Sequence, residues 1–455
     1  MRILKFRTYR TLTIFLVLAA VPLAAQEKLT LSAAVARALE ANPDLAVDAP
    51  GQEAARHEFE AARAGYLPRL DFEQSYLGGN NPVFVFGTLL SQQKFGLENF
   101  AIPALNSPDA IDNLQTRVTA QQTIWDFGRT RNRRDQARLG VEIADQAHEG
   151  HKQQVLLAIF DAYHAASLAQ ATLETARTAL RSAEAIESQA RARVDSGLTV
   201  EADLLRSQAY LSEARQQEIQ AQGQLESAWA QLNRLMGYPI SQKTAETAPL
   251  EPKNITVPPE EALLAEQKQR RPDYQNLLKE LRQAEVAAGS WQKEFLPVVV
   301  GYGTWELDNP SFSEYGGNNW SAGISLRWNL YAGGGDAAQR DAARQRLEQK
   351  RRQISAAESA MGLEIRKAVI QYRTAAQQVA AAQAAETQSE EGLRILKNRY
   401  DAGLATMTDL LSAETARSGA RTNLAGSIYR QRLSYAQIEY AAGLLSPTSP
   451  AMTVP

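Results

Sequence analysis

Hydrophobic and polar positions along this chain follow two different periods. From residue 128 to 237, and again from 334 to 443, Leu, Ile and Val recur among Ala, Gln, Glu and Arg, a composition with little helix penalty. At about 1.5 Å per residue, a helix from Arg129 to Asp195 would be roughly 100 Å long, far longer than an ordinary globular helix. We therefore predict two long helical hairpins, residues 128–237 and 334–443, that together form a rod.

Ahead of each helical hairpin the period changes to two. Arg69–Tyr76 alternates polar with mostly apolar residues, and Trp320–Leu330 alternates strictly, so both segments predict β-strands. Residues 113–125 and 298–307 are their expected partners, and each half of the chain thus contributes one β-hairpin. We place these hairpins at about residues 68–127 and 297–332, the first with an inserted loop at residues 78–112.

Shorter helices are predicted before each β-hairpin. In the first half, one helix covers Leu29–Leu39, and a longer one runs from Pro43, favourable at a first helical position, to about Tyr66. In the second half, the corresponding helices are Glu260–Arg271 and the segment that starts at Pro272.

The two halves are copies of one unit. The turn between the helices of the first hairpin shares seven of thirteen positions with the turn of the second, at a constant offset of 206 residues. Both turns follow the pattern Arg-x-Asp-x-Gly-Leu, which an internal duplication explains. We divide the chain into a signal peptide at 1–25, a first structural repeat at 26–245 and a second at 246–455.

The N-terminus indicates export. Arg2, Lys5, Arg7 and Arg10 precede an uncharged run that ends near Ala25, the pattern of a cleaved secretory signal. The formal net charge of the full chain is −2, and removal of these four basic residues leaves −6. The run is shorter than the roughly 20 apolar residues that a membrane-spanning helix needs, and none comparable follows.

Four strands are too few to close a barrel within one chain, and an open apolar sheet exposes edges that bind other chains. Strict alternation with Trp and Tyr near the strand ends is typical of a transmembrane β-barrel with an apolar lipid face and a polar lumen. A soluble sandwich edge is the alternative, and a signal peptide without a membrane helix favours the barrel.

Composition and candidate chemistry argue against several classes. The chain has no cysteine, so it has no disulfide, thiolate metal site or lipid-bearing cysteine, and its mildly acidic charge without a basic cluster argues against nucleic acid. His148 and His151 lie three apart, one residue short of the zinc-protease spacing, and Gly333–Gly335 lacks the Lys-Ser/Thr ending of a phosphate loop. We predict no catalytic residues, cofactor or metal, and hence no enzyme.

An ordered set of motifs resembles the outer-membrane efflux protein family, the TolC family. The set comprises Leu29–Leu39 with Asn42-Pro43, Leu67-Pro68, Ile124–Gly128 and the duplicated turns, and it covers nearly the whole mature chain. The resemblance implies a membrane α+β fold in which three protomers form a 12-stranded transmembrane β-barrel, four strands each, continued through the periplasm by an α-helical barrel. The inserted loop would then be extracellular.

The resemblance also implies contact roles at the turns. The family's tip turns meet the hairpin tips of a periplasmic adaptor, so adaptor docking is expected at Arg193, Asp195, Gly197, Leu198, Arg399, Asp401, Gly403 and Leu404. Helix C-capping alone would account for the two glycines. A second candidate set is Glu386, Glu390 and Glu391: in a trimer, one of them facing the lumen would become a ring of three carboxylates that selects cations, and a solvated outer face is the alternative.

These observations predict a passive outer-membrane exit duct. It would pass small molecules such as drugs or metals, or a secreted polypeptide, and it would work as a homotrimer in outer-membrane lipid. Its implied partners are a periplasmic adaptor of the membrane-fusion type and an inner-membrane pump of the resistance-nodulation-division, ABC or major facilitator type. A periplasmic structural or adaptor coiled-coil protein is the alternative, which explains the helical hairpins but not four alternating strands at duplicated positions.

Overall fold

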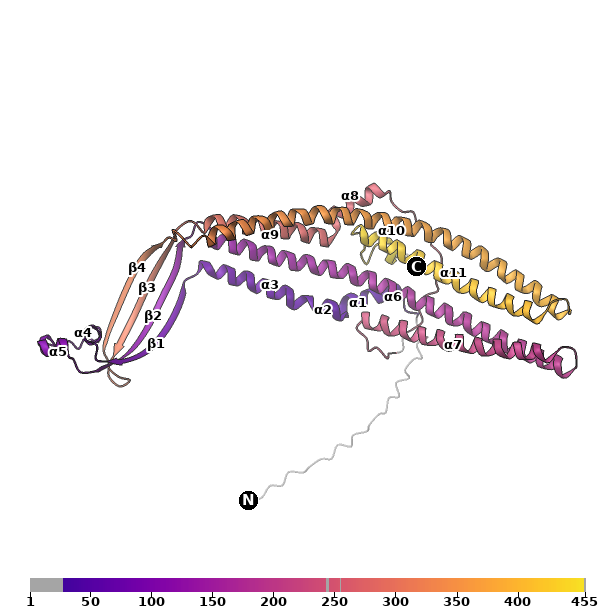
Figure 1. The fold of residues 1–455 in the computed structure, drawn as a ribbon, viewed down its shortest axis with the longest axis horizontal. Helices are drawn as coiled ribbons and strands as arrows, with labels where there is room; N and C mark the ends of the chain where they lie inside the picture. The colour runs from indigo at the N-terminus through magenta and orange to yellow at the C-terminus, as the bar shows by residue number, and fades with distance from the viewer. Residues whose placement is uncertain (1–27, 243–244, 254, 454–455) are drawn as a thin grey trace, which may run out of the picture.

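The computed structural model describes residues 28–242, 245–253 and 255–453, so the predicted signal peptide lies outside the described residues. The chain forms a long rod with a β-sheet at one end and two helical tips at the other (Figure 1). None of the helices in the described ranges combines the length and apolar character needed to cross a membrane.

Two helical hairpins of equal dimensions build most of the rod. The first consists of α6 (Arg129–Asp195) and α7 (Glu201–Leu235), and the second of α10 (Gly335–Asp401) and α11 (Met407–Ala441). Each long helix has 67 residues and each shorter one has 35. This equality follows the sequence duplication and agrees with the predicted hairpin limits.

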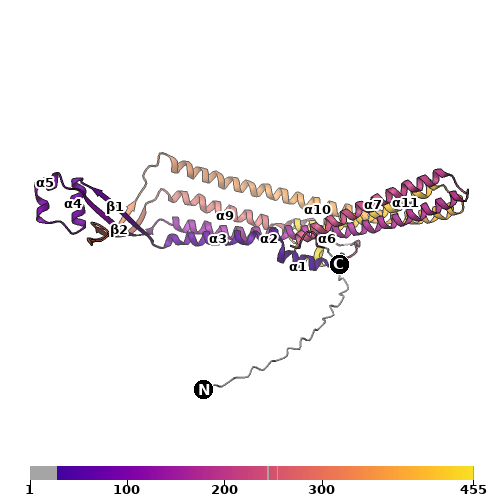
Figure 2. The ribbon, with the colours of Figure 1, turned by 90° about the horizontal axis from the view of Figure 1, so that it is seen from below.

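The principal hydrophobic core lies at the middle of the rod, where the shorter helices meet the hairpins (Figure 2). Its largest fully buried side chains include Ile159, Phe160, Leu232, Ile365 and Ile438. Farther toward the tips, the buried residues of α6 are mostly alanines, because small side chains let neighbouring helices approach closely. The core is therefore a narrow seam along the rod with a wider centre.

The first half begins with α1 (Leu31–Ala41), α2 (Pro43–Ala46), α3 (Asp48–Arg63) and the short 3₁₀ helix η1 (Ala64–Tyr66). The predicted single helix from Pro43 to Tyr66 is thus broken at Val47. Pro50 explains the break, because its nitrogen has no hydrogen to donate to the carbonyl of Ala46 one turn earlier. The second half has α8 (Glu260–Arg270) and an unbroken α9 (Pro272–Lys293), and α12 (Pro450–Thr453) ends the described chain.

Four antiparallel strands form one sheet in the order β1-β2-β3-β4. They are β1 (Arg69–Gly79), β2 (Ile111–Trp125), β3 (Val298–Asn309) and β4 (Gly317–Arg327). The two predicted hairpins are joined, because β2 of the first half pairs with β3 of the second. The outer edges of β1 and β4, both of 11 residues, have no partner strand among the described residues.

The strand registers sort the side chains onto two faces. Cross-strand partners such as Phe72 and Val118, or Trp305 and Trp320, share an apolar face, whereas the alternating positions are mostly polar, with Val300 among the exceptions. The apolar face carries mainly Leu70, Phe72, Tyr76, Val118, Trp305, Trp320, Ile324 and Leu326. The polar face carries Asp71, Glu73, Asn113, Gln115, Arg117, Glu306, Asp308, Asn319 and Ser321.

The inserted segment between β1 and β2 is helical rather than an irregular loop. It contains α4 (Pro82–Ser91), the 3₁₀ helix η2 (Leu97–Phe100) and α5 (Ile102–Asn106), and the strands extend to Gly79 and begin at Ile111. The Asn81 side chain caps α4 by accepting hydrogen bonds from the backbone N–H groups of Val83 and Phe84. The predicted loop limits, 78–112, enclose this segment.

Candidate functional site at the tips of the helical hairpins

The two tip turns have the same backbone hydrogen bonds. In the first turn, the N–H of Leu198 donates to the carbonyl of Arg193 at 2.8 Å, and in the second, that of Leu404 donates to Arg399 at 2.7 Å. Gly197 and Gly403 have φ of 72° and 76°, a left-handed conformation that side chains disfavour. This helix-terminating geometry accounts for both glycines without a partner.

The leucines are presented to solvent. Leu198 is 78% exposed and Leu404 is 68% exposed, although both side chains are apolar. In each turn, the backbone N–H of the leucine forms a hydrogen bond that closes the turn, whereas its side chain has no such role and is exposed. Each tip therefore exposes an apolar leucine, and the first tip also exposes Val200; adaptor docking at the tips stays a prediction.

The two tip arginines, equivalent in sequence, make different contacts. The guanidinium of Arg193 lies 4.6 Å from the centroid of the Tyr400 ring, and it donates to the carbonyl of Tyr400 at 3.4 Å. Arg399 instead donates to the carbonyl of Leu404 in its own turn, at 3.3 Å. Arg193 thus joins the first hairpin to the second, whereas Arg399 remains within its hairpin.

Asp401 belongs to the same junction. Its carboxylate accepts a hydrogen bond from Gln189 of α6 at 2.9 Å and lies 3.9 Å from the Arg193 guanidinium. Both Asp401 and its counterpart, Asp195, are exposed. The match between the two repeats predicted equivalent turns and did not point to Tyr400. The repeats differ at this position, where the first has Val194, and this difference could have indicated unequal roles.

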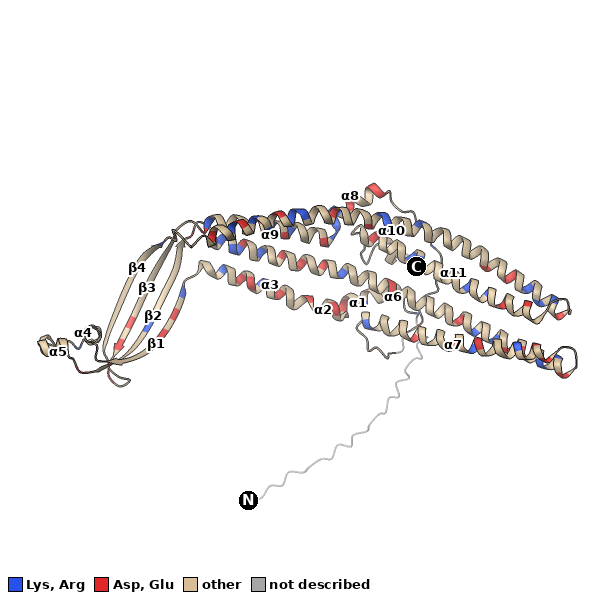
Figure 3. Cartoon of the chain, viewed as in Figure 1, with Lys and Arg blue, Asp and Glu red and all other residues tan. Residues whose placement is uncertain are grey.

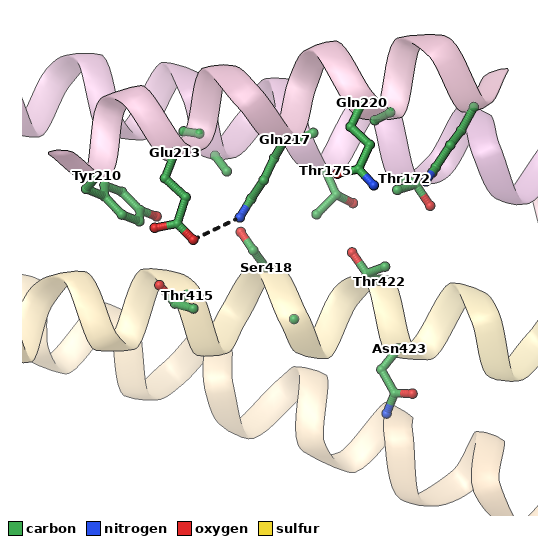
Figure 4. A pocket seen from close by; sticks show the side chains of 16 residues that line it. Thr172, Thr175, Tyr210, Glu213, Gln217, Gln220, Thr415, Ser418, Thr422 and Asn423 are labelled. Carbon is green, nitrogen blue, oxygen red and sulfur yellow. Dashed lines mark hydrogen bonds between the residues drawn. The ribbon is translucent and has the colours of Figure 1, made fainter. Parts of the chain in front are cut away.

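A groove lined by alanines and by hydroxyl and amide side chains runs between α7 and α11 on the tip side of the core. One section has a volume of about 550 Å³, and an adjoining section nearer the tips shares Tyr210, Glu213 and Thr415 with it. Figure 4 shows hydroxyl and amide side chains of α7 and α11 facing each other across this groove, including Gln217 and Ser418. Burial, with further contributions led by the nearby Glu414 carboxylate, raises the pKa of the Tyr210 hydroxyl to about 12, so it stays a hydrogen-bond donor.

The three candidate lumen carboxylates point in different directions. Glu386 lines a cavity between α6 and α11 together with Arg421, whereas Glu391 is exposed and forms an ion pair with Arg394 at 2.6 Å. At about 100° per residue, Glu391 is rotated by about 140° from Glu386, and Glu390 by only about 40°. The three side chains therefore cannot all face the lumen together, and a lumen ring formed by one of them stays a prediction.

A charged cluster that the sequence comparison did not single out lies on the polar face of the sheet. Arg117 of β2 forms ion pairs with Glu306 of β3 at 2.7 Å and with Glu73 of β1 at 3.5 Å. The alternating sequence pattern assigns all three residues to one face. Only the strand register in the structure shows that Arg117 lies opposite both Glu73 and Glu306. The cluster thus connects β1, β2 and β3 by ion pairs on the polar face of the sheet.

His148 and His151 share one partner. Both Nδ1 atoms face the carboxylate of Asp48 in α3, at 2.9 and 2.7 Å. Across the described residues, no group of three or more His, Cys, Asp or Glu side chains is arranged to hold a metal ion. The pair joins α3 to α6.

The chain, a rod of paired helical hairpins continuous with an open sheet that has one apolar and one polar face, is an outer-membrane channel component. It belongs to the outer membrane efflux protein family, whose model matches residues 34–238 and 263–444.

Individual relatives agree with this membership. The chain is 25% identical over 421 residues to the alkaline protease secretion protein AprF of Pseudomonas aeruginosa, covering 90% of this chain and 83% of AprF. It is 22% identical to the proteases secretion protein PrtF of Dickeya chrysanthemi, covering 87% and 84%. The solved Campylobacter jejuni CmeC outer membrane channel has the same fold, with a TM-score of 0.80, 18% identity and coverage of 92% and 87%.

The family defines the general role of the chain. It is an outer-membrane exit duct for efflux or secretion, and it extends from the outer membrane into the periplasm. The family is one of channel components and is not an enzyme class. The alternative of a periplasmic coiled-coil protein is not favoured, because the family match spans both halves of the chain.

Proposed function

We propose that three copies of this chain close into a 12-stranded β-barrel in the outer membrane, continued by an α-helical barrel in the periplasm. The observation that carries the proposal is the pair of unpaired sheet edges, on β1 and β4, which match in length. Exposed edges bind other strands, and pairing β4 of one copy with β1 of the next satisfies both. The two repeats, residues 26–245 and 246–455, supply two strands each.

The apolar face of this sheet has the dimensions of a membrane barrel. Exposed aromatic residues lie at both ends of the strands, with Tyr76, Trp305 and Trp320 toward the insertion and Trp125 and Trp328 toward the helices. Trp320 lies in β4 and Trp328 directly follows its last residue; eight residues of extended chain span about 27 Å, close to the height of the apolar band of outer-membrane barrels. Closure with the apolar face outward puts Arg117 and its acidic partners in the lumen.

The tips are the proposed docking site for a periplasmic adaptor. Three copies with two tips each would present six similar turns, and the exposed Leu198 and Leu404 give each turn an apolar contact. Arg399 and Asp195 add charge, whereas Arg193 is partly used in the junction with Tyr400. The adaptor would connect the duct to an inner-membrane pump.

The proposed cargo is a polypeptide. AprF and PrtF, which match this chain over most of their length, are both named as protease secretion proteins. If the chain serves secretion, its absence abolishes the release of a polypeptide into the medium and leaves resistance to small toxic compounds unchanged. The opposite outcome, lost resistance with normal secretion, would replace polypeptide by small molecules as the cargo.

Engineered cysteines test the closure directly, because the chain has no cysteine of its own. Ser75→Cys on the polar face of β1 is combined in turn with Ser321→Cys or Ser325→Cys on the polar face of β4. At least one pair should form disulfides between copies and give cross-linked dimers and trimers but no larger species. Native mass analysis in mild detergent should likewise give a trimer. The control Ile324→Cys, on the apolar face, should cross-link less well with position 75.

Two results would overturn the proposal. One is a stable monomer in mild detergent. The other is a trimer in which no β1–β4 pair cross-links, since that would place the contact between copies elsewhere.

A further inference from the structure

The insertion between β1 and β2 lies on the polar face of the sheet. The amide of Gln92, just after α4, donates to the Asn113 side chain at 3.0 Å, and Asn319 donates to the carbonyl of Ser91 at 3.1 Å. Asn113 and Asn319 both belong to the polar face. The insertion therefore folds to the side that would face the lumen, away from lipid.

A buried carboxylate holds this arrangement in place. Asp308 is only 1% exposed and accepts hydrogen bonds from the amides of Asn113 at 2.8 Å, Gln115 at 3.1 Å and Asn319 at 3.3 Å. Lys94 adds an ion pair to Glu314, in the turn between β3 and β4, at 2.6 Å. The insertion is thus held at the ends of β2 and β4 and at the turn between β3 and β4.

The outward surface of this unit is apolar. Its interior contains the ring contacts Phe86–Phe95 and Phe95–Phe100, yet Leu97 is 88% exposed and Ile102 is 73% exposed. Between residues 80 and 110, the charged side chains are Lys94, Glu98 and Asp109, and α4 and α5 are almost free of charge in Figure 3. A water-facing extracellular loop would be more polar, so this surface calls for a partner.

The position of α4 indicates which partner. It contacts β4, the edge strand that pairs with β1 of the next copy under the proposed closure. That neighbouring β1 ends at Gly79 and leads within three residues into the neighbour's α4. Pairing of the strands therefore brings the insertions of adjacent copies to the same place.

The width of the barrel leads to the same partner. Twelve strands about 4.8 Å apart and tilted by about 40° enclose a diameter of about 24 Å. α4 and α5 lie beyond the strand ends, at the outer mouth of this barrel (Figure 1), where three helices about 10 Å thick that lean toward the axis would fill most of its width.

We propose that residues 80–110 are a contact surface between copies of this chain, and that the three insertions meet through Leu97, Phe100 and Ile102 and narrow the outer mouth of the duct. The proposal rests on the trimeric closure described above. It assigns the exposed apolar surface to identical segments of the other two copies.

The test uses Leu97→Cys as the sole cysteine in the full-length chain. In outer membranes or nanodiscs, a short bis-maleimide should link two copies through position 97, because three identical sites surround one axis. Val47→Cys, on the α2–α3 connection and 71% exposed, is the matched control and should stay unlinked. Because Leu97 is exposed, neither change should affect folding or the native mass.

A functional measurement accompanies the cross-linking. Leu97→Asp with Ile102→Asp should separate the insertions by repulsion and raise single-channel conductance by about twofold or more. A trimer by native mass without linkage at position 97, or with unchanged conductance in the double variant, overturns this inference and leaves the closure intact. Quenching of a fluorophore at position 97 by brominated lipid without linkage also overturns it. A monomer by native mass would instead refute the trimer.

Discussion

The guanidinium of Arg193 in the first helical hairpin lies over the ring of Tyr400 in the second, 4.6 Å from its centroid. The same side chain approaches the carboxylate of Asp401 at 3.9 Å, so one residue joins the two tips by a cation–π contact and a weak ion pair. Tyr400 is buried beneath it. The tips of one protomer are therefore held together by an interaction that only one of the two duplicated arginines makes.

The first prediction concerns this junction. Arg193→Ala should cost about 1 kcal/mol of local stability, because a partly exposed cation–π contact and its hydrogen bonds are lost. Hydrogen exchange at the two tips should become about fivefold faster while exchange in the central core is unchanged. Arg399→Ala, which removes contacts within one turn only, is the control. Equal acceleration by both variants would contradict the assignment.

The second prediction concerns pH. Burial would raise the pKa of Asp48, but hydrogen bonds from His148 and His151 outweigh burial and hold the pKa of this carboxyl below its usual 3.8. A lowered folded-state pKa stabilises the protein fully above 3.8, and this contribution disappears as the pH falls through the lower folded-state value.

Asp48→Asn should accordingly reduce stability at neutral pH, by on the order of 1 kcal/mol, and flatten the loss of stability below about pH 4. Thermal unfolding followed between pH 3 and 7 measures both effects. His57→Gln, a change at an exposed histidine of α3, is the control and should leave the curve unchanged. A steeper acid loss in Asp48→Asn than in the original chain would refute the assignment.

Periodicity and duplication predicted most of the fold. The hairpins were located closely because their helices contain a repeated composition and end at glycines that need positive φ, such as Gly197. Alternation also sorted strand residues such as Phe72 and Arg117 onto opposite faces before the register was known.

The remaining features depend on contacts between distant segments. The pairing of β2 with β3 joins residues that are far apart in the sequence, such as Leu114 with Asn309, and no local pattern specifies it. The helices of the insertion are apolar nearly throughout, so they lack the periodicity of an amphipathic helix, and Asn81 was their main local signal. Arg193 and Arg399 play unequal roles because α6 of the first hairpin packs against α11 of the second. A comparison of the two turn sequences cannot show this packing.

The third prediction concerns the carboxylate that anchors the insertion. Asp308→Ala should leave the amides of Asn113, Gln115 and Asn319, the first buried and the others partly exposed, without this acceptor and cost about 2–3 kcal/mol locally, so the insertion should detach from the sheet. Protease cleavage between residues 80 and 110 should then become faster on intact cells. Asp308→Asn retains an acceptor oxygen and should have a smaller effect. Resistance to cleavage in Asp308→Ala would mean that the apolar contacts alone hold the insertion.

The last prediction concerns the second pair of tip charges. In a closed ring, first and second hairpins alternate, so each second hairpin would adjoin the first hairpin of the next copy. Within one copy, Arg193 faces Asp401. Because the two repeats are equivalent, Arg399 should face Asp195 of the next copy in the same way. Val194 stands where Tyr400 would be, so this contact between copies lacks the aromatic ring and should be weaker.

Charge exchange distinguishes this contact from adaptor docking, which uses the same residues. Arg399→Glu alone should place like charges together, open the ring of tips and raise channel conductance, and Asp195→Arg alone should remove the same ion pair. The double variant restores opposite charges, so conductance should return to its original value if the two residues face each other. Adaptor capture should not recover in parallel, because the docking surface then carries altered charges. Conductance effects that simply add in the double variant would show that Arg399 and Asp195 do not meet.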